Sequence, residues 1–208
     1  MNKSDLQIIV LFSGYSEIQE NTMNANCTCT LIKGPPNCII DTMTAWDGSK
    51  IIEALHKHEI TPNDINYVIC THGHSDHIGS NHLFQNAIHI VGFSVSQRDH
   101  YSLSPDIGKG ENYEITDNIK VISTPGHTLQ DVSVLVKINN LIYAITGDLF
   151  EKFEDLEDDS IWISAGSDNE QLQRTNRAKI LKIANFIIPG HGPMFQVPQK
   201  YKVIKNDT

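Results

Sequence analysis

His72, His74, Asp76 and His77 form a short cluster of side chains that can bind metal ions. Alternating residues of an extended segment point the same way, so His72 and His74 can share one ion. A turn at Ser75 would aim Asp76 and His77 at a neighbouring position. Imidazole and carboxylate groups suit zinc, and also iron or manganese. Because no cysteine lies nearby to close a structural zinc site, the cluster predicts an open, catalytic metal site.

Three further residues share a local pattern in which a loop with a glycine directly follows an apolar strand. They are His127, Asp148 and His191. The glycine lets the backbone turn sharply and brings the next side chain to the end of the strand. Each motif alone is weak, because a Gly-Asp pair is usually a turn and a single loop histidine is usually solvated. Together with the first cluster they predict a metal centre assembled from loops at strand ends.

Hydrophobic periodicity places strands and helices around these loops. Strands are expected at Gln7–Phe12, Thr28–Lys33, Cys38–Asp41, Ile65–Cys70, Ala87–Val91, Ile119–Ser123, Val132–Lys137, Leu141–Thr146 and Phe186–Ile188. Helices are expected at Gly48–His58 and at Ser167–Lys182, where Ser167 and Glu170 have capping-box spacing. Two short helices are also expected, one that begins after the capping residue Thr61 and one that follows the His72–His77 loop and ends at Leu83. Asn139 and Asn140 are typical of a hairpin turn. This order predicts sheets packed face to face with helices outside, within a single domain over residues 1–208.

The composition is that of an ordinary globular protein, with 208 residues, 39% hydrophobic and 20% charged. The longest apolar run near the N-terminus, Ile8–Phe12, is too short for a signal peptide or a membrane span, which needs about 20 residues. We therefore expect a cytoplasmic location, with the nucleus as the alternative, and no membrane partner. The net charge of −9 argues against broad, nonspecific affinity for nucleic acid. The acidic run from Glu151 to Asp159 is typical of a solvated loop.

The cysteines are expected to be reduced and buried. Cys27, Cys29, Cys38 and Cys70 form no CxxC pair. Without a signal peptide, reduced thiols that pack as small hydrophobic side chains are favoured. No second pair completes a zinc site, so the expected metal centre contains no cysteine.

The order His-x-His-x-Asp-His, then His, then Asp, then His resembles the metallo-β-lactamase superfamily, and the resemblance covers nearly the whole chain. It implies an α/β fold, a four-layer αββα metallo-β-lactamase sandwich with the metals at one edge. It also implies that the first metal is bound by His72, His74 and His127, the second by Asp76, His77 and His191, and that Asp148 bridges them. Asp41 matches a position where an aspartate supports the site, although a turn-forming role explains it equally well.

Several branches of the superfamily fit the sequence less well. True β-lactamases commonly carry a cysteine where this chain has Asp148. Glyoxalase II proteins carry a C-terminal helical domain, whereas only Gln196–Thr208 follow the last motif here. The large RNA 3′-end nucleases carry an inserted second domain. Persulfide dioxygenases use one iron and lack the full second site.

A closer resemblance is to the family of metallo-β-lactamase domain-containing protein 1. The matching segments are Thr71–Gly79, Thr124–His127, Asp131–Val134, Gly147–Glu151 and Ile188–Pro193. The Thr71–Gly79 motif is found across the superfamily. The Gly-Asp-x-Phe-Glu segment at Gly147–Glu151, with the acidic residues after it, narrows the resemblance to this one family. The resemblance implies a zinc-dependent endoribonuclease that acts on RNA phosphodiesters in histone pre-mRNA 3′-end processing.

The expected cofactor is two zinc ions, with iron or manganese as alternatives. Two such ions lower the pKa of a bridging water toward about 7, and the hydroxide would attack a phosphorus or carbonyl centre. Asp148 would fix the metal spacing. Asp76 is expected to be catalytic, by orienting the nucleophile or by shuttling a proton to the leaving group. His82 is another candidate acid, although a helix histidine of this kind is more often solvated.

Substrate-binding groups outside the metal centre are harder to assign. The cationic candidates for an RNA partner are Arg174, Arg177, Lys179 and Lys182, and the aromatic candidates in expected loops are Tyr101, Tyr113 and Trp162. Such cations are more often a solvated helix face, and packing explains the aromatic residues equally well. Three other functions stay open: hydrolysis of a small thioester, ester or lactone, metal binding without turnover, and thiol oxidation by iron. A homodimer is common for such sandwiches, and no exposed stripe in the sequence identifies one.

Overall fold

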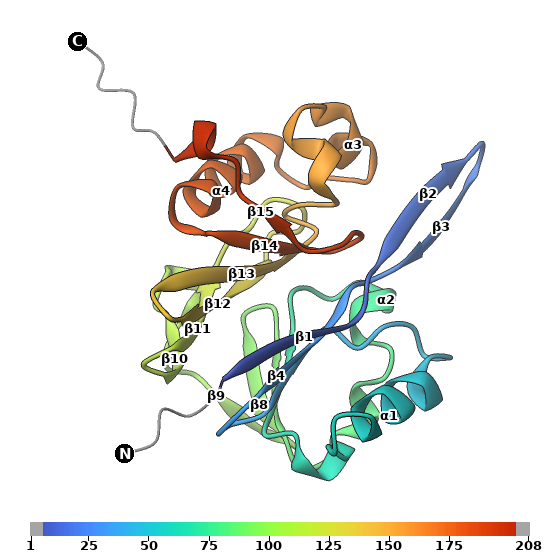
Figure 1. Ribbon diagram of the computed structural model, residues 1–208, viewed down its shortest axis with the longest axis vertical. Helices are drawn as coiled ribbons and strands as arrows, with labels where there is room; N and C mark the ends of the chain where they lie inside the picture. Colours follow the sequence, from blue (N-terminus) through green and yellow to red (C-terminus); the bar gives the residue numbers. More distant parts are fainter. Residues whose placement is uncertain (1–5, 203–208) are drawn as a thin grey trace.

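The computed structural model describes residues 6–202 and is built around two large β-sheets (Figure 1). Among these residues, the first sheet has seven strands in the order β1-β4-β5-β6-β7-β8-β9. They are β1 (Gln7–Phe12), β4 (Cys29–Lys33), β5 (Cys38–Ile40), β6 (Tyr67–Cys70), β7 (Ile88–Val91), β8 (Ser94–Gln97) and β9 (His100–Ser102). The second sheet of the described chain has six strands, β10 to β15 in sequence order. They are β10 (Tyr113–Thr116), β11 (Ile119–Ser123), β12 (Val132–Ile138), β13 (Leu141–Gly147), β14 (Phe186–Pro189) and β15 (Phe195–Gln196).

A separate hairpin and a set of helices complete the described chain. The hairpin consists of β2 (Tyr15–Gln19) and β3 (Thr22–Asn26), and it projects away from both sheets (Figure 1). The α-helices are α1 (Gly48–His56), α2 (Ser75–Ile78), α3 (Asp159–Ser164) and α4 (Glu170–Ile183). Short 3₁₀ turns are η1 (Pro62–Asp64), η2 (Asn81–Leu83), η3 (Ile107–Lys109), η4 (Phe153–Leu156) and η5 (Gln199–Tyr201).

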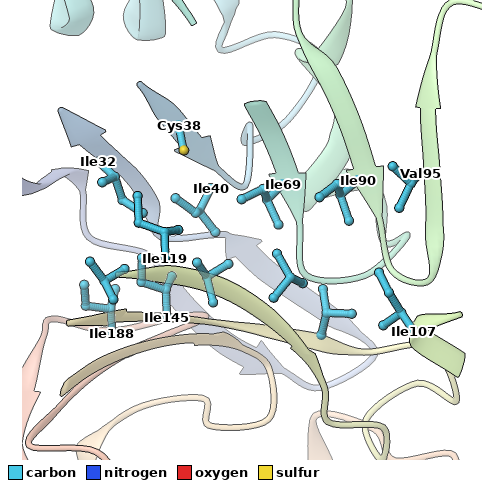
Figure 2. Close-up of a cluster of buried hydrophobic side chains, with 14 residues drawn as sticks. Ile32, Cys38, Ile40, Ile69, Ile90, Val95, Ile107, Ile119, Ile145 and Ile188 are labelled. Atoms are coloured by element: carbon cyan, nitrogen blue, oxygen red, sulfur yellow. The ribbon is translucent and has the colours of Figure 1, made fainter. Parts of the chain in front are cut away.

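The core between the two sheets consists mainly of β-branched side chains (Figure 2). Ile40, Ile69 and Ile90 of the first sheet pack in one buried cluster with two residues of the second sheet, Ile145 and Ile188. Side chains alternate across a strand, so the neighbours of these residues point to the outer faces. Each such burial stabilises the fold by roughly 1.5–3 kcal/mol.

Each sheet also buries its outer face under a helix. Leu55 of α1 clusters with Ile39 on the first sheet. Ile180 of α4 clusters with Ala144 and Ile187 on the second sheet. The layers are therefore helix, sheet, sheet and helix, which confirms the four-layer αββα sandwich predicted from the sequence (Figure 1).

Parallel strands bring the motif loops to one edge of the sandwich. β5, β6 and β7 are parallel neighbours, with Ile69 paired to both Ile40 and Ile90. In the second sheet, β13 and β14 are also parallel, with Ile145 paired to Ile188. Parallel strands end at the same edge, so the loops that follow them gather there. These loops carry most of the predicted metal ligands.

Several predicted elements lie where the sequence placed them. β1 and β11 have the predicted bounds, and most other predicted strands differ from the structure by one or two residues at an end. Asn139 and Asn140 have φ of 50° and 65°, the backbone conformation of a two-residue hairpin turn. Helix α4 is also present, but its predicted cap was wrong. Asn169 caps it by accepting from the Leu172 amide at 3.0 Å, whereas Ser167 donates to Gly126 O.

Some strands were not predicted. The hairpin β2–β3 has mostly polar, exposed residues, and its few apolar residues give no clear strand signal. Strands β8, β9 and β10 are short and only partly buried. These strands form through pairing with neighbours, and such pairing is not visible in their own composition.

The acidic run after Phe150 is only partly the solvated loop that its charge predicted. It forms η4 and the start of α3, and Glu154, Glu157, Asp158 and Asp159 are exposed, as predicted. Glu151 and Asp155 are buried, so the prediction was wrong for these two acids. Asp155 makes an ion pair with Arg177 of α4, with Nη2 to Oδ1 at 2.8 Å, and this partner from a distant helix compensates its charge.

The cysteines behave as predicted. Cys27, Cys29, Cys38 and Cys70 are free thiols and are fully buried. Burial raises the pKa of the Cys38 thiol to about 12, which disfavours its thiolate. Across residues 6–202, no helix combines the length and apolar character needed to cross a membrane.

Candidate metal centre

His72, His74, His127 and Asp148 bring four candidate ligand atoms close together. His72 Nε2 lies 2.9 Å from His74 Nδ1, which lies 3.1 Å from His127 Nε2. Asp148 Oδ2 lies 3.3 Å from His127 Nε2 and 3.6 Å from His72 Nε2. Ligand atoms bound tetrahedrally at about 2.0–2.1 Å from a zinc ion are about 3.4 Å apart. These spacings therefore fit a single ion.

A second group of ligand atoms lies beside the first. Asp76 Oδ2 lies 3.8 Å from His77 Nε2 and 3.8 Å from His191 Nε2. Asp148 Oδ1 lies 3.3 Å from His77 Nε2, and Asp148 Oδ2 lies 3.3 Å from His191 Nε2. The Asp148 carboxylate therefore stands between the two groups. The structure brings together all the side chains predicted as metal ligands.

Three buried polar atoms of this centre have no hydrogen-bond partner among the described residues. They are Asp76 Oδ2, His77 Nε2 and Asp148 Oδ1. Buried polar atoms are nearly always paired, so three unpaired atoms facing one another need an explanation. A bound cation would satisfy all three at once. The donor set therefore fits a pair of metal ions.

Hydrogen bonds on the far side of three imidazoles fix which nitrogen faces the centre. His77 Nδ1 lies 2.9 Å from Asp41 Oδ2, and His127 Nδ1 lies 2.7 Å from Gly166 O. His191 Nδ1 lies 3.0 Å from the carbonyl oxygen of Asn26. Carboxylate and carbonyl oxygens only accept, so each Nδ1 donates. Each Nε2 therefore keeps its lone pair for a metal.

Asp41 links the end of β5 to the first ligand loop. Its side chain is buried, and its Oδ1 accepts from the Thr71 amide at 2.7 Å while Oδ2 accepts from His77. Its φ is 56°, a left-handed conformation that aspartate tolerates, but no turn is assigned at residues 41–44. The contacts of Asp41 therefore favour the supporting role over the turn-forming alternative.

Replacing Asp41 with Asn should weaken metal binding roughly 10–100-fold, because its single amide oxygen cannot accept from both the Thr71 amide and His77 Nδ1, and its NH₂ group would face one of these donors. Metal affinity can be measured by competition with a chromophoric chelator. The exposed residue Asp117 provides the control, since Asp117→Asn removes the same charge. An Asp41→Asn variant that competes as well as the wild type would contradict the positioning role.

Burial and charge act in opposite directions within the centre. Burial lowers the pKa of His72 well below its usual value, and it also lowers the pKa of His74. For His191, burial acts in the same direction, but the Asp148 carboxylate outweighs it and raises the pKa to about 9. Burial works against ionised Asp148, yet His77 and His191 hold its pKa well below the usual value. Asp148 is therefore the anionic anchor of the centre.

Close packing explains two of the motif glycines. Gly147 has a φ of 52°, and a Cβ there would collide with the Thr71 side chain. A Cβ on Gly190 would collide with the Asp148 carboxylate. The ligand loops can therefore approach one another only with glycine at these positions.

Exposed apolar side chains occur in the loop after β5, which carries Asp41, and in the loops that carry His127 and His191. Trp46 is 89% exposed at the tip of a turn closed by the Asp47 amide donating to Thr44 O at 3.1 Å. Leu129 and Met194 are 56% and 44% exposed and follow His127 and His191 closely in sequence. We call Trp46, Leu129 and Met194 the apolar rim. These three residues were not predicted from the sequence, although Leu129 and Met194 follow the His127 and His191 motifs closely enough to be a usable signal.

Three of the seven candidate RNA-binding side chains contact other parts of the chain. Trp162 is fully buried in α3, and Arg177 is buried with its guanidinium 4.3 Å from the Phe150 ring centre. Arg174 pairs with Asp159. Trp162 and Arg177 are therefore unavailable to a substrate, which leaves packing as the role of Trp162 and excludes both the RNA contact and the solvated helix face for Arg177.

The remaining candidates differ in exposure. Tyr113 lies in β10 with its ring edge-on to Tyr67, whereas Tyr101 of β9 is exposed. Lys179 and Lys182 are exposed on α4. His82 is exposed in η2, as expected of a solvated histidine, and it lines a surface pocket of about 560 Å³ together with His89 and Arg98. That pocket has no carboxylate in its lining.

Comparison with known protein families matches residues 24–122 to the metallo-beta-lactamase superfamily. The chain is 37% identical to metallo-beta-lactamase domain-containing protein 1 of Xenopus laevis, over 96% of this chain and 85% of the relative. It is 35% identical to the human protein of that name, over 79% of this chain, and spans 60% of the relative's length.

Two further similarities concern other relatives. An N-acyl homoserine lactonase of Bacillus cereus is 29% identical over 74% of this chain and 65% of the relative. Among solved structures, a putative metallo-beta-lactamase from Thermotoga maritima aligns with a TM-score of 0.67 and 20% identity. That alignment covers 92% of this chain and 99% of the other, so the whole arrangement of layers is shared.

Proposed function

This chain belongs to the metallo-beta-lactamase superfamily and is a metal-dependent hydrolase, and from that premise we propose that it is a dizinc endoribonuclease. The observation that carries the hydrolytic part is the placement of Asp148 between two groups of donors with unpaired buried atoms. The RNA part rests on the resemblance of the Gly147–Glu151 segment and the acidic stretch after it to the endoribonuclease family. Zinc is proposed because histidines dominate the first group of donors.

The centre opens to solvent on the side of His74 and Asp76. His74 is exposed and the Asp76 side chain is 18% exposed, whereas His72 and His77 are buried. A substrate phosphate would therefore approach past His74 and Asp76. Metal ions at the two groups of donors would activate water and neutralise charge on the substrate oxygen.

The chain's own residues would then position the reaction. Asp148 stays anionic and holds the two groups of donors at a fixed spacing. Asp76 has one buried oxygen directed at the donors and is open to solvent at its other side, so it can accept or pass on a proton at the mouth of the centre. Asp41 keeps the His77 imidazole oriented.

The direct test is cleavage of labelled single-stranded RNA by the zinc-loaded protein. We expect cleavage by the wild type and a distribution of internal cuts, as an endonuclease produces. Metal stoichiometry is measured on the same preparation. Two bound ions without RNA cleavage would contradict the RNA proposal and leave the hydrolytic centre in place.

Trp46 is proposed to stack on an RNA base near the metal centre. A base stacked on an aromatic side chain contributes roughly 1–3 kcal/mol, so Trp46→Ala should weaken RNA binding about tenfold or more. Trp162 is fully buried, so quenching of tryptophan fluorescence by RNA would report mainly on Trp46. Leu103→Ala is the matched control, because Leu103 is 90% exposed on the loop after β9. Equal RNA affinity in the Trp46 and Leu103 variants would contradict the stacking role.

A second candidate substrate is a small ester or lactone with an apolar chain. The apolar rim of Trp46, Leu129 and Met194 favours it, because such side chains would bind an acyl group. The sequence similarity to an N-acyl homoserine lactonase points the same way. Release of acid from an N-acyl lactone, followed at constant pH, distinguishes this candidate from the RNA proposal.

A further inference from the structure

Glu151 is a buried carboxylate beside the metal centre that the functional assignments above do not use. It is 1% exposed and lies on the loop that follows β13 and Asp148. Its Oε2 accepts from Ser16 Oγ of β2 at 3.1 Å. Its backbone carbonyl accepts from the His191 amide at 2.9 Å. Ser16 therefore holds the Glu151 side chain, and the His191 amide holds its backbone next to the candidate ligand His191.

The Glu151 side chain reaches the candidate ligand atoms themselves. A carboxylate oxygen of Glu151 and ligand atoms of Asp148 and His191 all lie within 4.8 Å of one another. This cluster shares His191 with the group that contains Asp76 and His77, and it shares Asp148 with both groups of donors. Glu151 therefore adds an oxygen donor on the His191 side of the centre.

No lysine or arginine side chain forms an ion pair with Glu151 within residues 6–202, and its charged neighbour is the candidate ligand His191. The buried guanidinium of Arg177 is paired with Asp155. Burying a carboxylate without a counter-charge is costly, so such groups are protonated, pair with cations or bind metals. The buried or half-buried carboxylates around the centre are Asp41, Asp76, Asp148 and Glu151.

We propose that Glu151 is a further ligand of the cation held by Asp76, His77 and His191, and that it makes this site richer in oxygen than the first. The inference rests on the metal centre of the proposed function. The first group offers three imidazoles and the Asp148 carboxylate, whereas the second with Glu151 offers two imidazoles and three carboxylates. Carboxylates suit manganese better than imidazoles do. The second site therefore accepts Mn²⁺ more readily than the first.

The test is a metal titration that needs no substrate. Metal-free protein receives one equivalent of Zn²⁺ and is then titrated with Mn²⁺, whose free form is followed by its electron paramagnetic resonance signal. We expect the wild type to bind one Zn²⁺ and one Mn²⁺. Glu151→Gln keeps an acceptor for Ser16 but loses the anionic ligand, so its Mn²⁺ affinity should fall roughly 10–100-fold. Zn²⁺ binding at the first site should be unchanged.

Three further variants separate a ligand from other roles. Glu154→Gln removes the same charge from an exposed position and should bind Mn²⁺ like the wild type. Glu151→Asp keeps the charge on a side chain one methylene shorter, and it should also bind Mn²⁺ more weakly. Ser16→Ala removes the hydroxyl that contacts Glu151 and should retain most of the Mn²⁺ affinity.

Each remaining outcome overturns a definite statement. Unchanged Mn²⁺ affinity in Glu151→Gln, with two ions in the wild type, would overturn the ligand role and leave the metal centre intact. A loss in Ser16→Ala as large as in Glu151→Gln would assign Glu151 to anchoring the hairpin instead. A wild type that binds no ion at all would overturn the proposed metal centre together with this inference.

Discussion

Asp148→Asn should give a folded protein that holds at most one metal ion per chain and hydrolyses no substrate at a useful rate. Asp148 is the residue whose oxygens lie within 3.3–3.6 Å of ligand nitrogens from both groups, on His72, His77, His127 and His191. An amide in its place offers one neutral oxygen and turns an NH₂ group toward imidazole nitrogens or a cation. We expect kcat to fall by at least ~10³-fold for whichever substrate the wild type hydrolyses.

The measurement combines metal analysis of the dialysed protein with initial rates under saturating substrate. Asp117→Asn serves as the control, because it removes a carboxylate from an exposed turn. Far-ultraviolet circular dichroism checks that the Asp148 variant is folded. Full activity with one ion lost would show that a single metal suffices and that Asp148 does not bridge.

The ligand motifs could be predicted from the sequence because each is a local signal. His72, His74, Asp76 and His77 lie within one loop, and a glycine precedes each of the remaining ligands. Strand periodicity then placed these loops at strand ends, where the parallel pairs β5–β6 and β13–β14 bring them together. Local chemistry and regular strand order were sufficient for this part of the site.

Residues whose role depends on a distant partner could not be predicted in this way. Glu151 is separated by 135 positions from Ser16, and Asp155 by 22 positions from Arg177. In the sequence both acids belong to an acidic run, and such a run normally faces solvent. Only the packing of α4 and the hairpin against that segment makes them buried. Composition therefore gave the wrong prediction for these two acids, whereas the other four acids of the run are exposed as it predicted.

The hairpin β2–β3 has a second role that its side chains do not reveal. The backbone carbonyls of Tyr15 and Asn26, a directly paired couple at its base, both lie within hydrogen-bond distance of His191 Nδ1, at 3.1 Å and 3.0 Å. Any residue type supplies a carbonyl, so no sequence motif marks this contact. The hairpin base thus orients a candidate metal ligand.

Arg177 of helix α4 connects this helix to the segment that follows the candidate ligand Asp148. Its Nη1 donates to Leu149 O at 2.8 Å, and its Nη2 donates to Asp155 Oδ1 at 2.8 Å and Asp155 O at 2.9 Å. Asp155 Oδ2 in turn accepts from the Glu151 amide at 2.7 Å. Leu149 and Asp155, and through Asp155 also Glu151, are therefore held by one guanidinium. Loss of that group should affect both stability and the geometry of the centre.

Arg177→Met should lower the free energy of unfolding by about 3–5 kcal/mol, because it leaves the fully buried Asp155 carboxylate without its counter-charge. The melting temperature should fall by roughly 10 °C. Arg174→Met is the matched control on the same helix. It breaks the exposed pair between Arg174 and Asp159, which contributes at most about 1 kcal/mol.

The double variant Arg177→Met with Asp155→Leu separates two contributions to the loss of stability: the unpaired charge of Asp155 and the lost packing of the Arg177 side chain. If the cost lies mainly in the unpaired carboxylate, the double variant should recover a large part of the stability lost by Arg177→Met. Its metal affinity should nevertheless stay below that of the wild type, because Leu149 O and the Glu151 amide have lost their partners. Denaturant unfolding and chelator competition measure the two effects separately. If Arg177→Met were no less stable than Arg174→Met, the guanidinium would not hold the acidic segment against α4.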